Sequence, residues 1–158
     1  MSVRRATVGD EGVLRALRVA ALSDAPQAFG STLEREEART LNDWRRWLSP
    51  GVTFLAVDDN DVAVGLVAGL VAQEPGVADL VSMWVHPDRR GTGLAGELVR
   101  ALVTWSEAEQ RLLRLHVVDR NVSAIALYRR HGFRTTGDVT VRENGVCELV
   151  MARTATWQ

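Results

Sequence analysis

The sequence is poor in the features that mark a disulfide scaffold, a membrane protein or a nucleic-acid-binding protein. Its single cysteine, Cys147, cannot form an internal disulfide, and it shows neither a secretory leader nor an apolar run of 18 residues. The formal net charge is only −1, so no overall positive field favours nucleic acid. We therefore expect a cytoplasmic protein with no nucleic-acid partner and no membrane partner.

Lysine is absent as well, since all 19 basic residues are arginine. The chain thus offers no ε-amine on which it could acylate itself. The remaining composition, with 46% hydrophobic and 25% charged residues among 158, is typical of a globular protein. A chain of this length can bury most of its apolar surface in one core, so we expect a single domain over residues 1–158.

The order of the predicted elements is that of an α/β domain. Period-two and continuous apolar runs predict strands, and apolar residues at helical spacing predict helices. The predicted strands are 3–7, 53–57, 63–72, 78–85 and 112–118, followed by a hairpin within 133–151. Four helices are predicted. The first begins at a Thr7-x-x-Asp10 capping box, the second spans about 34–48, the third follows the glycine-rich turn near residue 91, and the fourth spans 122–131.

The most informative segment is residues 85–96, VHPDRRGTGLAG, which joins an apolar strand to an amphipathic helix. Gly91 and Gly93 leave the backbone accessible, several amides can point into one concavity, and the helix adds the positive end of its dipole. Arg89 and Arg90 supply mobile charge beside this turn. The segment suits a phosphate, although an isolated turn of this kind is also a common strand-to-helix connection.

A dinucleotide-binding interpretation competes for the same turn. Residues 91–96 match the G-x-G-x-x-G pattern, and Asp119 follows where a ribose-binding acid is expected. However, the turn lies past the middle of the chain, a polar loop separates the strand from the glycines, and few residues follow Asp119. A nicotinamide-dependent enzyme is therefore a less favoured alternative.

A second motif, NVSAIALYRRHGF at residues 121–133, follows the turn after one more predicted strand. Together with Arg90-x-x-Gly93-x-Ala95, it resembles the GNAT superfamily of acyl-CoA-dependent N-acyltransferases. The resemblance covers residues 77–153 in particular. It implies one mixed, mostly antiparallel sheet of about seven strands flanked by four helices, with a splayed wedge between the fourth and fifth strands.

The resemblance also implies an activity: transfer of an acetyl group from acetyl-CoA to a primary amine, by direct attack through a tetrahedral intermediate and without a metal. The acceptor is either a small-molecule amine or an amine of a peptide or protein. A non-catalytic acyl-CoA sensor is an alternative, because it would use the same turn.

His86, His116 and His131 share no metal-ligand spacing. The five tryptophans are compatible with core packing, with an aromatic site or with a homodimer face.

Site residues follow from the same resemblance. Asn121 and Tyr128 lie two helical turns apart on one face, so they can share a ligand. The family pattern makes Asn121 a partner of the pantetheine arm and Tyr128 the general acid that protonates the leaving sulfur. A backbone amide near residues 83–85 is the oxyanion donor. The implied cofactor-binding residues are Met83, Trp84, Val85, Arg89, Arg90, Gly91, Thr92, Gly93, Leu94, Ala95, Asn121, Ala124 and Tyr128.

The acceptor side and the general base are less well defined. Residues 24–32 resemble the acceptor-side segment of some family members, which makes Phe29, Gly30 and Ser31 substrate-binding candidates. Asp79 lies on the strand before the turn, where several members carry an acidic base, and its short side chain calls for a relayed water. A solvated surface charge explains Asp79 equally well. The weaker candidates for the base are Ser82, His86, Glu34, Glu36 and Glu37.

Overall fold

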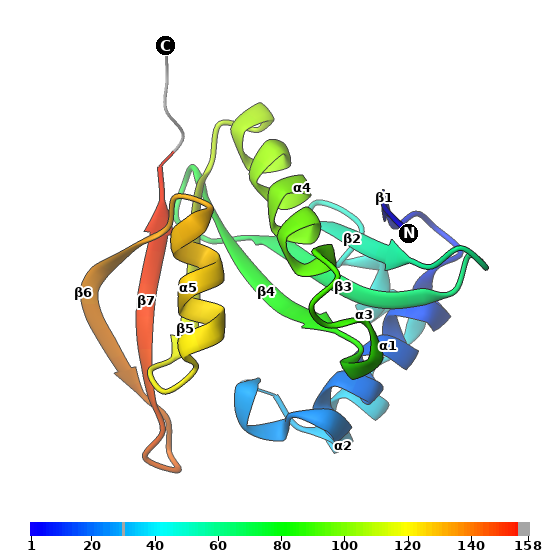
Figure 1. Ribbon diagram of the computed structural model, residues 1–158, viewed down its shortest axis with the longest axis horizontal. Helices are drawn as coiled ribbons and strands as arrows, with labels where there is room; N and C mark the ends of the chain where they lie inside the picture. The colour runs from blue at the N-terminus through cyan, green and yellow to red at the C-terminus, as the bar shows by residue number, and fades with distance from the viewer. Residues whose placement is uncertain (30, 155–158) are drawn as a thin grey trace.

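The computed structural model of the protein describes residues 1–29 and 31–154. Within these ranges it is an α/β fold with one seven-stranded sheet in the order β1-β2-β3-β4-β5-β7-β6 (Figure 1). The strands are β1 Ser2–Arg5, β2 Val52–Val57, β3 Ala63–Val71, β4 Val77–Val85, β5 Leu112–Val118, β6 Arg134–Val141 and β7 Cys147–Arg153. The helices are α1 Glu11–Asp24, α2 Leu33–Glu37, α3 Leu41–Arg45, α4 Leu94–Ala108 and α5 Val122–Arg130, with short 3-10 turns η1 Pro26–Ala28 and η2 Pro87–Arg89.

Helices cover both faces of the sheet, as expected for this class. Helix α4 buries Leu94, Leu98 and Leu102 in one apolar cluster, to which α5 adds Ile125 and the sheet adds its inward residues. A second cluster on the opposite face contains apolar residues of α1 and α3. Each fully buried leucine stabilises the fold by roughly 1.5–3 kcal/mol, so the wide apolar stripe of α4 anchors the helix that follows the glycine-rich turn.

The predicted helix over residues 34–48 is wrong, because the chain forms two short helices there. Thr32 caps α2 by accepting a hydrogen bond from the backbone of Arg35. Thr40 then begins α3 with a full capping box: its hydroxyl accepts from the Asp43 backbone N–H at 3.2 Å, and the Asp43 carboxylate accepts from the Thr40 backbone N–H at 2.8 Å. This second cap satisfies amides that a continuous helix would have paired. The described residues therefore form five α-helices rather than the expected four.

The start of α1 also differs from the expectation. Helix α1 begins at Glu11, and only half of the predicted Thr7–Asp10 capping box forms, because the Asp10 carboxylate accepts from the Thr7 backbone N–H at 2.8 Å. The same carboxylate binds Arg4 of β1. Asp10 therefore joins the first strand to the first helix rather than serving as the third residue of that helix.

The expected wedge between the fourth and fifth strands is confirmed. β4 and β5 are parallel, and they pair only from Val77 with Leu112 to Asp79 with Arg114. All other neighbouring strands of the sheet are antiparallel. A bulge in β4 adds to the divergence, since Ser82 and Met83 lie opposite the single residue Val67 of β3, and Ser82 has a φ of 62°. Beyond Asp79, no strand of the described residues pairs with the edge of β4 that faces β5.

Candidate active site

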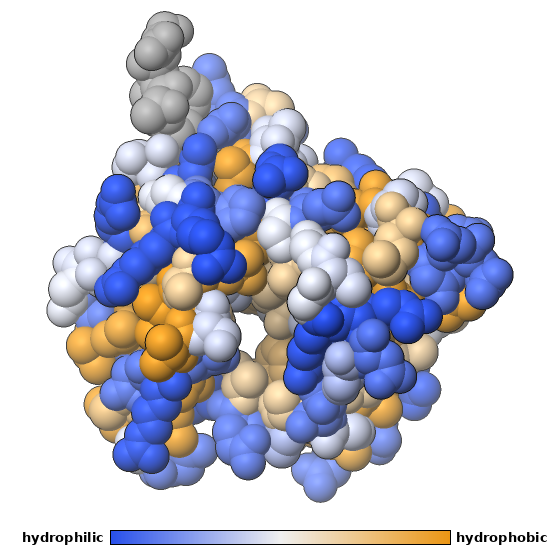
Figure 2. All heavy atoms as spheres, viewed as in Figure 1, coloured by the Kyte–Doolittle hydropathy of each residue, from blue (hydrophilic) through white to orange (hydrophobic). Residues whose placement is uncertain are grey.

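A cavity of about 480 Å³ occupies the wedge between β4 and β5. Figure 2 shows a hollow at this place on the face that it displays, between the β5–α5 side and the α1–α2 side of Figure 1. The cavity brings together six of the residues predicted from the sequence: Phe29, Asp79, Met83, Asn121, Ala124 and Tyr128. These residues come from the segment before α2, from β4 and from α5.

The cavity crosses the sheet rather than lying on one face. Leu115 and Val117 of β5 belong to the core cluster under α4 and α5, so Arg114 and His116, which alternate with them, point to the opposite face. Residues of both sets, Val117 as well as Arg114 and His116, line the cavity. A ligand could therefore enter from the α5 side and meet another ligand that enters from the α1–α2 side.

The α5 end of the cavity presents a buried tyrosine. Tyr128 is 6% exposed and packs edge-to-face on Phe133, with ring centroids 5.7 Å apart. Its hydroxyl has no hydrogen-bond partner among residues 1–29 and 31–154. Burial raises the pKa of this hydroxyl above its ordinary value, because the charged form would lose its solvation. Tyr128 therefore keeps its proton at neutral pH, in contact with the cavity.

Asn121 and Ala124 precede Tyr128 along the same helix. Asn121 is the N-cap of α5, and its side-chain oxygen accepts a hydrogen bond from the Ala124 backbone N–H at 3.2 Å. Asn121 thus has a structural role as the N-cap of α5. The side-chain amide of Asn121 remains at the cavity wall, and the small Ala124 leaves room beside it.

The glycine-rich turn adopts the conformation that its glycines permit. Gly91 and Gly93 have φ values of 78° and 85°, and a Cβ at either position would meet no protein atom within 4 Å. Gly93 is the N-cap of the 15-residue helix α4 but offers no side-chain cap, so the first amides of the helix lack acceptors within the described chain. The backbone N–H groups of Leu94 and Ala95 are among these amides, and they lie at the positive end of a long helix.

Each of the two arginines of the turn lies beside a carboxylate of the protein. Arg90 donates to the Val85 carbonyl at 3.1 Å and to Asp24 at 2.6 Å, and Asp24 also accepts from the Trp84 indole at 3.0 Å. Arg89 lies 3.6 Å from Asp58. Arg90 therefore ties the turn to the end of α1. Of the predicted strand residues, Met83 lines the cavity, while Trp84 and Val85 have buried side chains.

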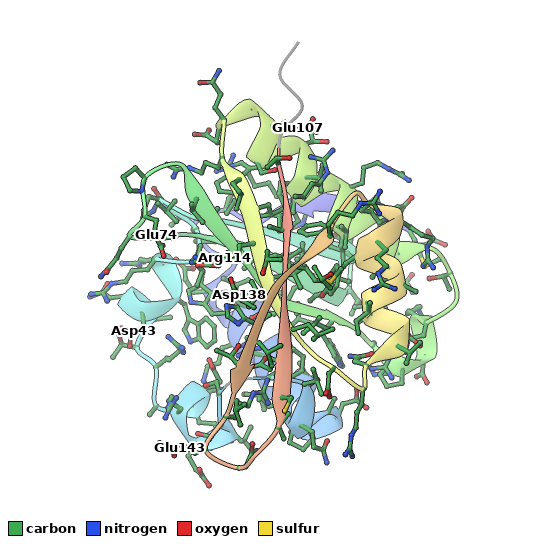
Figure 3. The ribbon with its side chains drawn as sticks, turned by 90° about the vertical axis from the view of Figure 1, so that its left-hand side faces the viewer. Asp43, Glu74, Glu107, Arg114, Asp138 and Glu143 are labelled. Carbon is green, nitrogen blue, oxygen red and sulfur yellow. The ribbon has the colours of Figure 1, made fainter. Side chains whose placement is uncertain are left out.

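At the opposite end of the cavity Asp79 is bound by Arg114. The guanidinium donates from Nε to Oδ1 at 2.7 Å and from Nη2 to Oδ2 at 3.1 Å, so both carboxylate oxygens are occupied. Arg114 also binds Glu74, and Figure 3 shows these two side chains next to each other. The hydrogen bonds that Arg114 donates to Asp79 and then to Glu74 raise the pKa of its guanidinium. Asp79 is therefore one member of an ion-pair network, not an isolated surface charge.

An outer cavity of about 780 Å³ adjoins the first one beside the segment that precedes α2. Phe29, Arg142 and Glu148 line both cavities, whereas Ser31 lines only the outer one. Gly30, the remaining substrate-binding candidate, lies outside the described residues. Among the weaker candidates for the base, Glu34 lines the outer cavity and Ser82 the inner one, while Glu36, Glu37 and His86 line neither.

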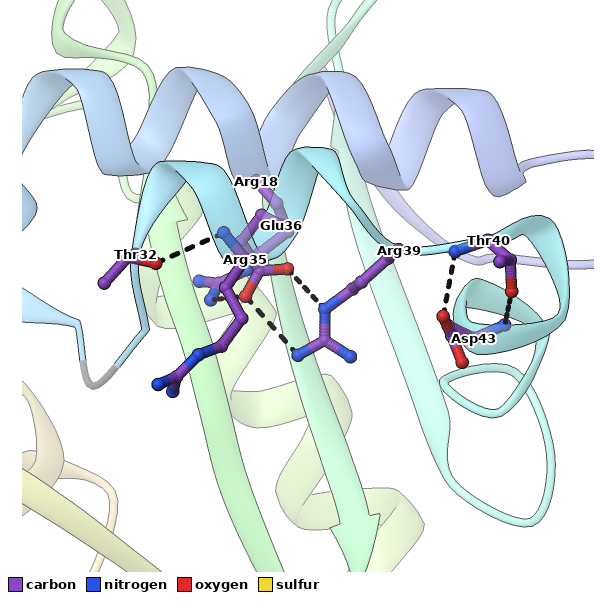
Figure 4. A network of polar contacts seen from close by, with 7 residues as sticks. All are labelled: Arg18, Thr32, Arg35, Glu36, Arg39, Thr40 and Asp43. Atoms are coloured by element: carbon purple, nitrogen blue, oxygen red, sulfur yellow. Dashed lines mark hydrogen bonds and ion pairs between the residues drawn. The ribbon is translucent and has the colours of Figure 1, made fainter.

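Glu36 belongs instead to a buried network beneath the acceptor-side segment (Figure 4). Arg18 donates to its Oε1 at 3.0 Å and Arg39 to its Oε2 at 2.7 Å. The Arg18 guanidinium also lies over the Phe29 ring, 5.2 Å from its centroid. Through this cation–π contact the network supports Phe29, which lines the cavity.

The sequence analysis missed four charged or polar residues of the inner cavity: Arg114, His116, Arg142 and Glu148. Arg114 and His116 alternate along β5 with residues that point to the core, which is the signal that could have found them. Glu148 lies in β7, whereas Arg142 follows the end of β6 in the hairpin loop, where no such alternation marks it. Within the described residues, no group of three or more His, Cys, Asp and Glu side chains is placed to hold a metal ion. No helix in that part of the chain has the length and apolar character needed to span a bilayer.

Comparison with known proteins agrees with this geometry. The sequence model of the Acetyltransferase (GNAT) family matches residues 17–133. The chain belongs to the GNAT family. An uncharacterized N-acetyltransferase of Schizosaccharomyces pombe is 30% identical over 114 residues, which are 70% of each protein. The peptidyl-lysine N-acetyltransferase YjaB of Salmonella typhimurium is 29% identical over 77% of this chain and 76% of its own length. Mycothiol acetyltransferase of Beutenbergia cavernae is 28% identical over 80% of this chain and 42% of its own length.

Solved GNAT structures share the fold at lower identity. An acetyltransferase of the GNAT family from Streptococcus pneumoniae superimposes with a TM-score of 0.82 at 21% identity, covering 98% of this chain and 99% of that one. The ribosomal-protein-alanine N-acetyltransferase of Brucella melitensis gives a TM-score of 0.79 at 21% identity, with the same coverage. The protein is thus a GNAT N-acetyltransferase, a family whose co-substrate is acetyl-CoA.

Proposed function

We propose that this protein transfers the acetyl group of acetyl-CoA to a primary amine by direct attack. The observation that supports this most strongly is the cavity that crosses the sheet at the wedge, with a protonated tyrosine at one end and an acceptor-side cavity at the other. A direct transfer needs both substrates in contact, and a passage open to both faces supplies that contact.

The hydrogen-bond donors of the turn, of β4 and of α5 suit successive parts of acetyl-CoA. The pyrophosphate would bind the free amides of residues 91–95 at the start of α4, where no Cβ hinders its approach. The pantetheine arm would then run along the unpaired edge of β4 near Met83, beside the Asn121 amide and Ala124. Arg90 would hold the turn in place, because its Nε donates to the Val85 carbonyl and its Nη2 to Asp24.

Three groups would then serve the reaction. As the amine nitrogen bonds to the thioester carbon, a backbone amide near residues 83–85 would stabilise the oxyanion. Collapse breaks the carbon–sulfur bond, and Tyr128 would donate its proton to the departing thiolate. Asp79 is the proposed acceptor of the amine's proton through a water. A carboxylate has about four lone-pair sites, and Arg114 uses two of those on Asp79.

The named relatives do not identify the acceptor. The two bacterial proteins are named for a peptidyl lysine and for mycothiol, and their identities to this chain are nearly equal. The proposal is therefore limited to a primary amine. Its test is release of free coenzyme A thiol, followed with a thiol reagent, when the purified protein receives acetyl-CoA and a panel of alkylamines, amino acids and lysine peptides.

We expect amine-dependent thiol release and an acetylated product detectable by mass spectrometry. Acetyl-CoA should also raise the melting temperature, since ligand at a hundredfold excess over its Kd stabilises the native state by about 2.7 kcal/mol. Stabilisation by acetyl-CoA with no turnover of any amine would favour an acyl-CoA sensor. Stabilisation by NAD alone would favour the dinucleotide interpretation.

A further inference from the structure

The Arg142–Glu148 ion pair stands at the junction of the two cavities. The side chains of both residues line the inner and the outer cavity, and both are largely buried, with 16% and 15% of the side chain exposed. Arg142 donates from Nη2 to Glu148 Oε2 at 2.9 Å and from Nη1 to the Gln27 carbonyl at 2.9 Å. Arg142 therefore joins the β6–β7 hairpin to η1 and holds the Glu148 carboxylate at this junction.

Glu148 differs from Asp79 in the oxygen that remains available. Arg114 occupies both oxygens of Asp79, whereas Glu148 uses only Oε2, and its Oε1 has no donor among the described residues. A partly buried carboxylate with a free oxygen is a strong site for a cationic hydrogen-bond donor. A primary alkylamine is such a donor, because it is almost wholly protonated at neutral pH.

We propose that Glu148 binds the ammonium group of the acceptor, and that Arg142 positions the Glu148 carboxylate. The bound ammonium releases one proton to water before its nitrogen attacks the thioester, since only the neutral amine is a nucleophile. This inference rests on the proposed acetyl transfer and specifies how its acceptor is recognised. The outer cavity agrees with an alkyl chain behind the ammonium group, because Leu22, Pro26, Phe29 and Leu33 supply apolar wall there. The recognised chemistry is an aliphatic chain that ends in a primary ammonium, either in a free diamine or in a lysine side chain of a peptide.

The test compares Glu148→Gln with the parent in steady-state kinetics. Glutamine keeps the shape of the side chain and an acceptor for Arg142 but removes the negative charge. Hydrogen bonds to charged groups are the stronger ones, so we expect KM for 1,5-diaminopentane, or for an N-terminally blocked peptide with one lysine, to rise about tenfold. KM for acetyl-CoA should stay within about twofold of the parent's value. The acceptor that shows the larger increase identifies the source of the ammonium group.

Two controls keep the test decisive. Glu107→Gln removes a carboxylate that also pairs with an arginine, at 2.8 Å from Arg153, but lies far from the β6–β7 hairpin tip, as the positions of Glu107 and Glu143 in Figure 3 show. It should leave both KM values unchanged. Aniline is uncharged at neutral pH, so its KM should not respond to Glu148→Gln.

Contrary outcomes are distinct. An unchanged KM for the alkylamines, or an equal increase for aniline and acetyl-CoA, overturns the assignment of Glu148. Failure of the parent protein to acetylate any amine would instead reject the proposed function. If Glu148→Gln lowers the melting temperature, Arg142→Gln with circular dichroism and the same kinetics separates positioning from folding. Arg142→Gln should raise KM for the alkylamine and leave KM for acetyl-CoA at the parent's value.

Discussion

Asp79 and Arg114 are the last paired residues of β4 and β5, and their side chains are joined by two hydrogen bonds at the point where the strands diverge. The backbone pairing ends there, and the cavity begins on the same side chains. The apex of the wedge is thus closed by an ion pair that also forms one end of the site. Any role of Asp79 in proton transfer has to be exercised in the presence of Arg114.

Asp79→Asn tests that role. If Asp79 accepts the amine's proton through a water, the variant should turn over more slowly at neutral pH and recover part of its rate at alkaline pH, where more free amine exists. The affinity for acetyl-CoA should hardly change. The measurement is a pH–rate profile of parent and variant with one amine. A profile identical to the parent's would leave Asp79 as a structural partner of Arg114 alone.

Tyr128→Phe separates an enzyme from a sensor. The thiolate of coenzyme A is already a fair leaving group, so loss of its proton donor should lower kcat by about 10² while packing on Phe133 and acetyl-CoA affinity persist. Stopped assays at saturating amine measure kcat, and thermal shift measures binding. Loss of acetyl-CoA binding, or unfolding, would make Tyr128 structural. An unaltered kcat would place the general acid elsewhere.

Gly93→Val should remove the stabilisation that acetyl-CoA confers. A branched side chain would project into the space that the proposed phosphate site requires. The backbone φ of 85° at residue 93 is unfavourable for valine and would cost roughly 1–2 kcal/mol of stability even without ligand. Gly145→Val is the matched control, because Gly145 has a φ of 83°, faces open space and lies in the β6–β7 hairpin. The control should lose similar stability yet retain the acetyl-CoA shift in melting temperature. A retained shift in Gly93→Val would contradict the assignment of the turn.

Glu36→Gln should destabilise the fold by about 3 kcal/mol, because it leaves the buried Arg18 guanidinium without its counter-charge. Its neighbour Glu37 is exposed, so Glu37→Gln should change stability by less than about 0.5 kcal/mol. Urea unfolding at neutral pH measures both differences. Equal stability of the two variants would show that the network in Figure 4 contributes little.

The same carboxylate predicts a pH dependence of stability. Burial alone would raise the pKa of Glu36, but the interaction with Ser31, hydrogen bonds from Arg39 and Arg18, and the charge of Arg18 outweigh it and hold the pKa below its ordinary value of 4.5. A lowered pKa in the folded state stabilises the fold above that ordinary value, and this contribution is lost as the pH falls through the folded pKa. The stability difference between parent and Glu36→Gln should therefore be largest near neutrality and shrink in acid. A constant difference from pH 7 to pH 3 would contradict it.

The sequence by itself determined the features that depend on local spacing. The glycines of residues 91–96 and the helical stripe of α4 predicted the strand–turn–helix segment, and the motif over residues 121–133 carried the resemblance that implied the family and its wedge. Tyr128 and Asn121 belong to this group, because two turns of one helix place them on the same face. Backbone conformation and helical period follow from neighbouring residues, so they can be read without knowledge of the rest of the chain.

The tertiary structure alone decided which distant side chains meet. Arg90 reaches Asp24 across 66 residues, and Arg142 reaches Gln27 across 115, and neither pairing leaves a sign in the local pattern. Arg114 and Glu148 enter the site only because strand register aligns β5 with β4 and β7. Long-range register and buried charge pairing are properties of the whole packed chain, and they decide what surrounds each locally predicted residue.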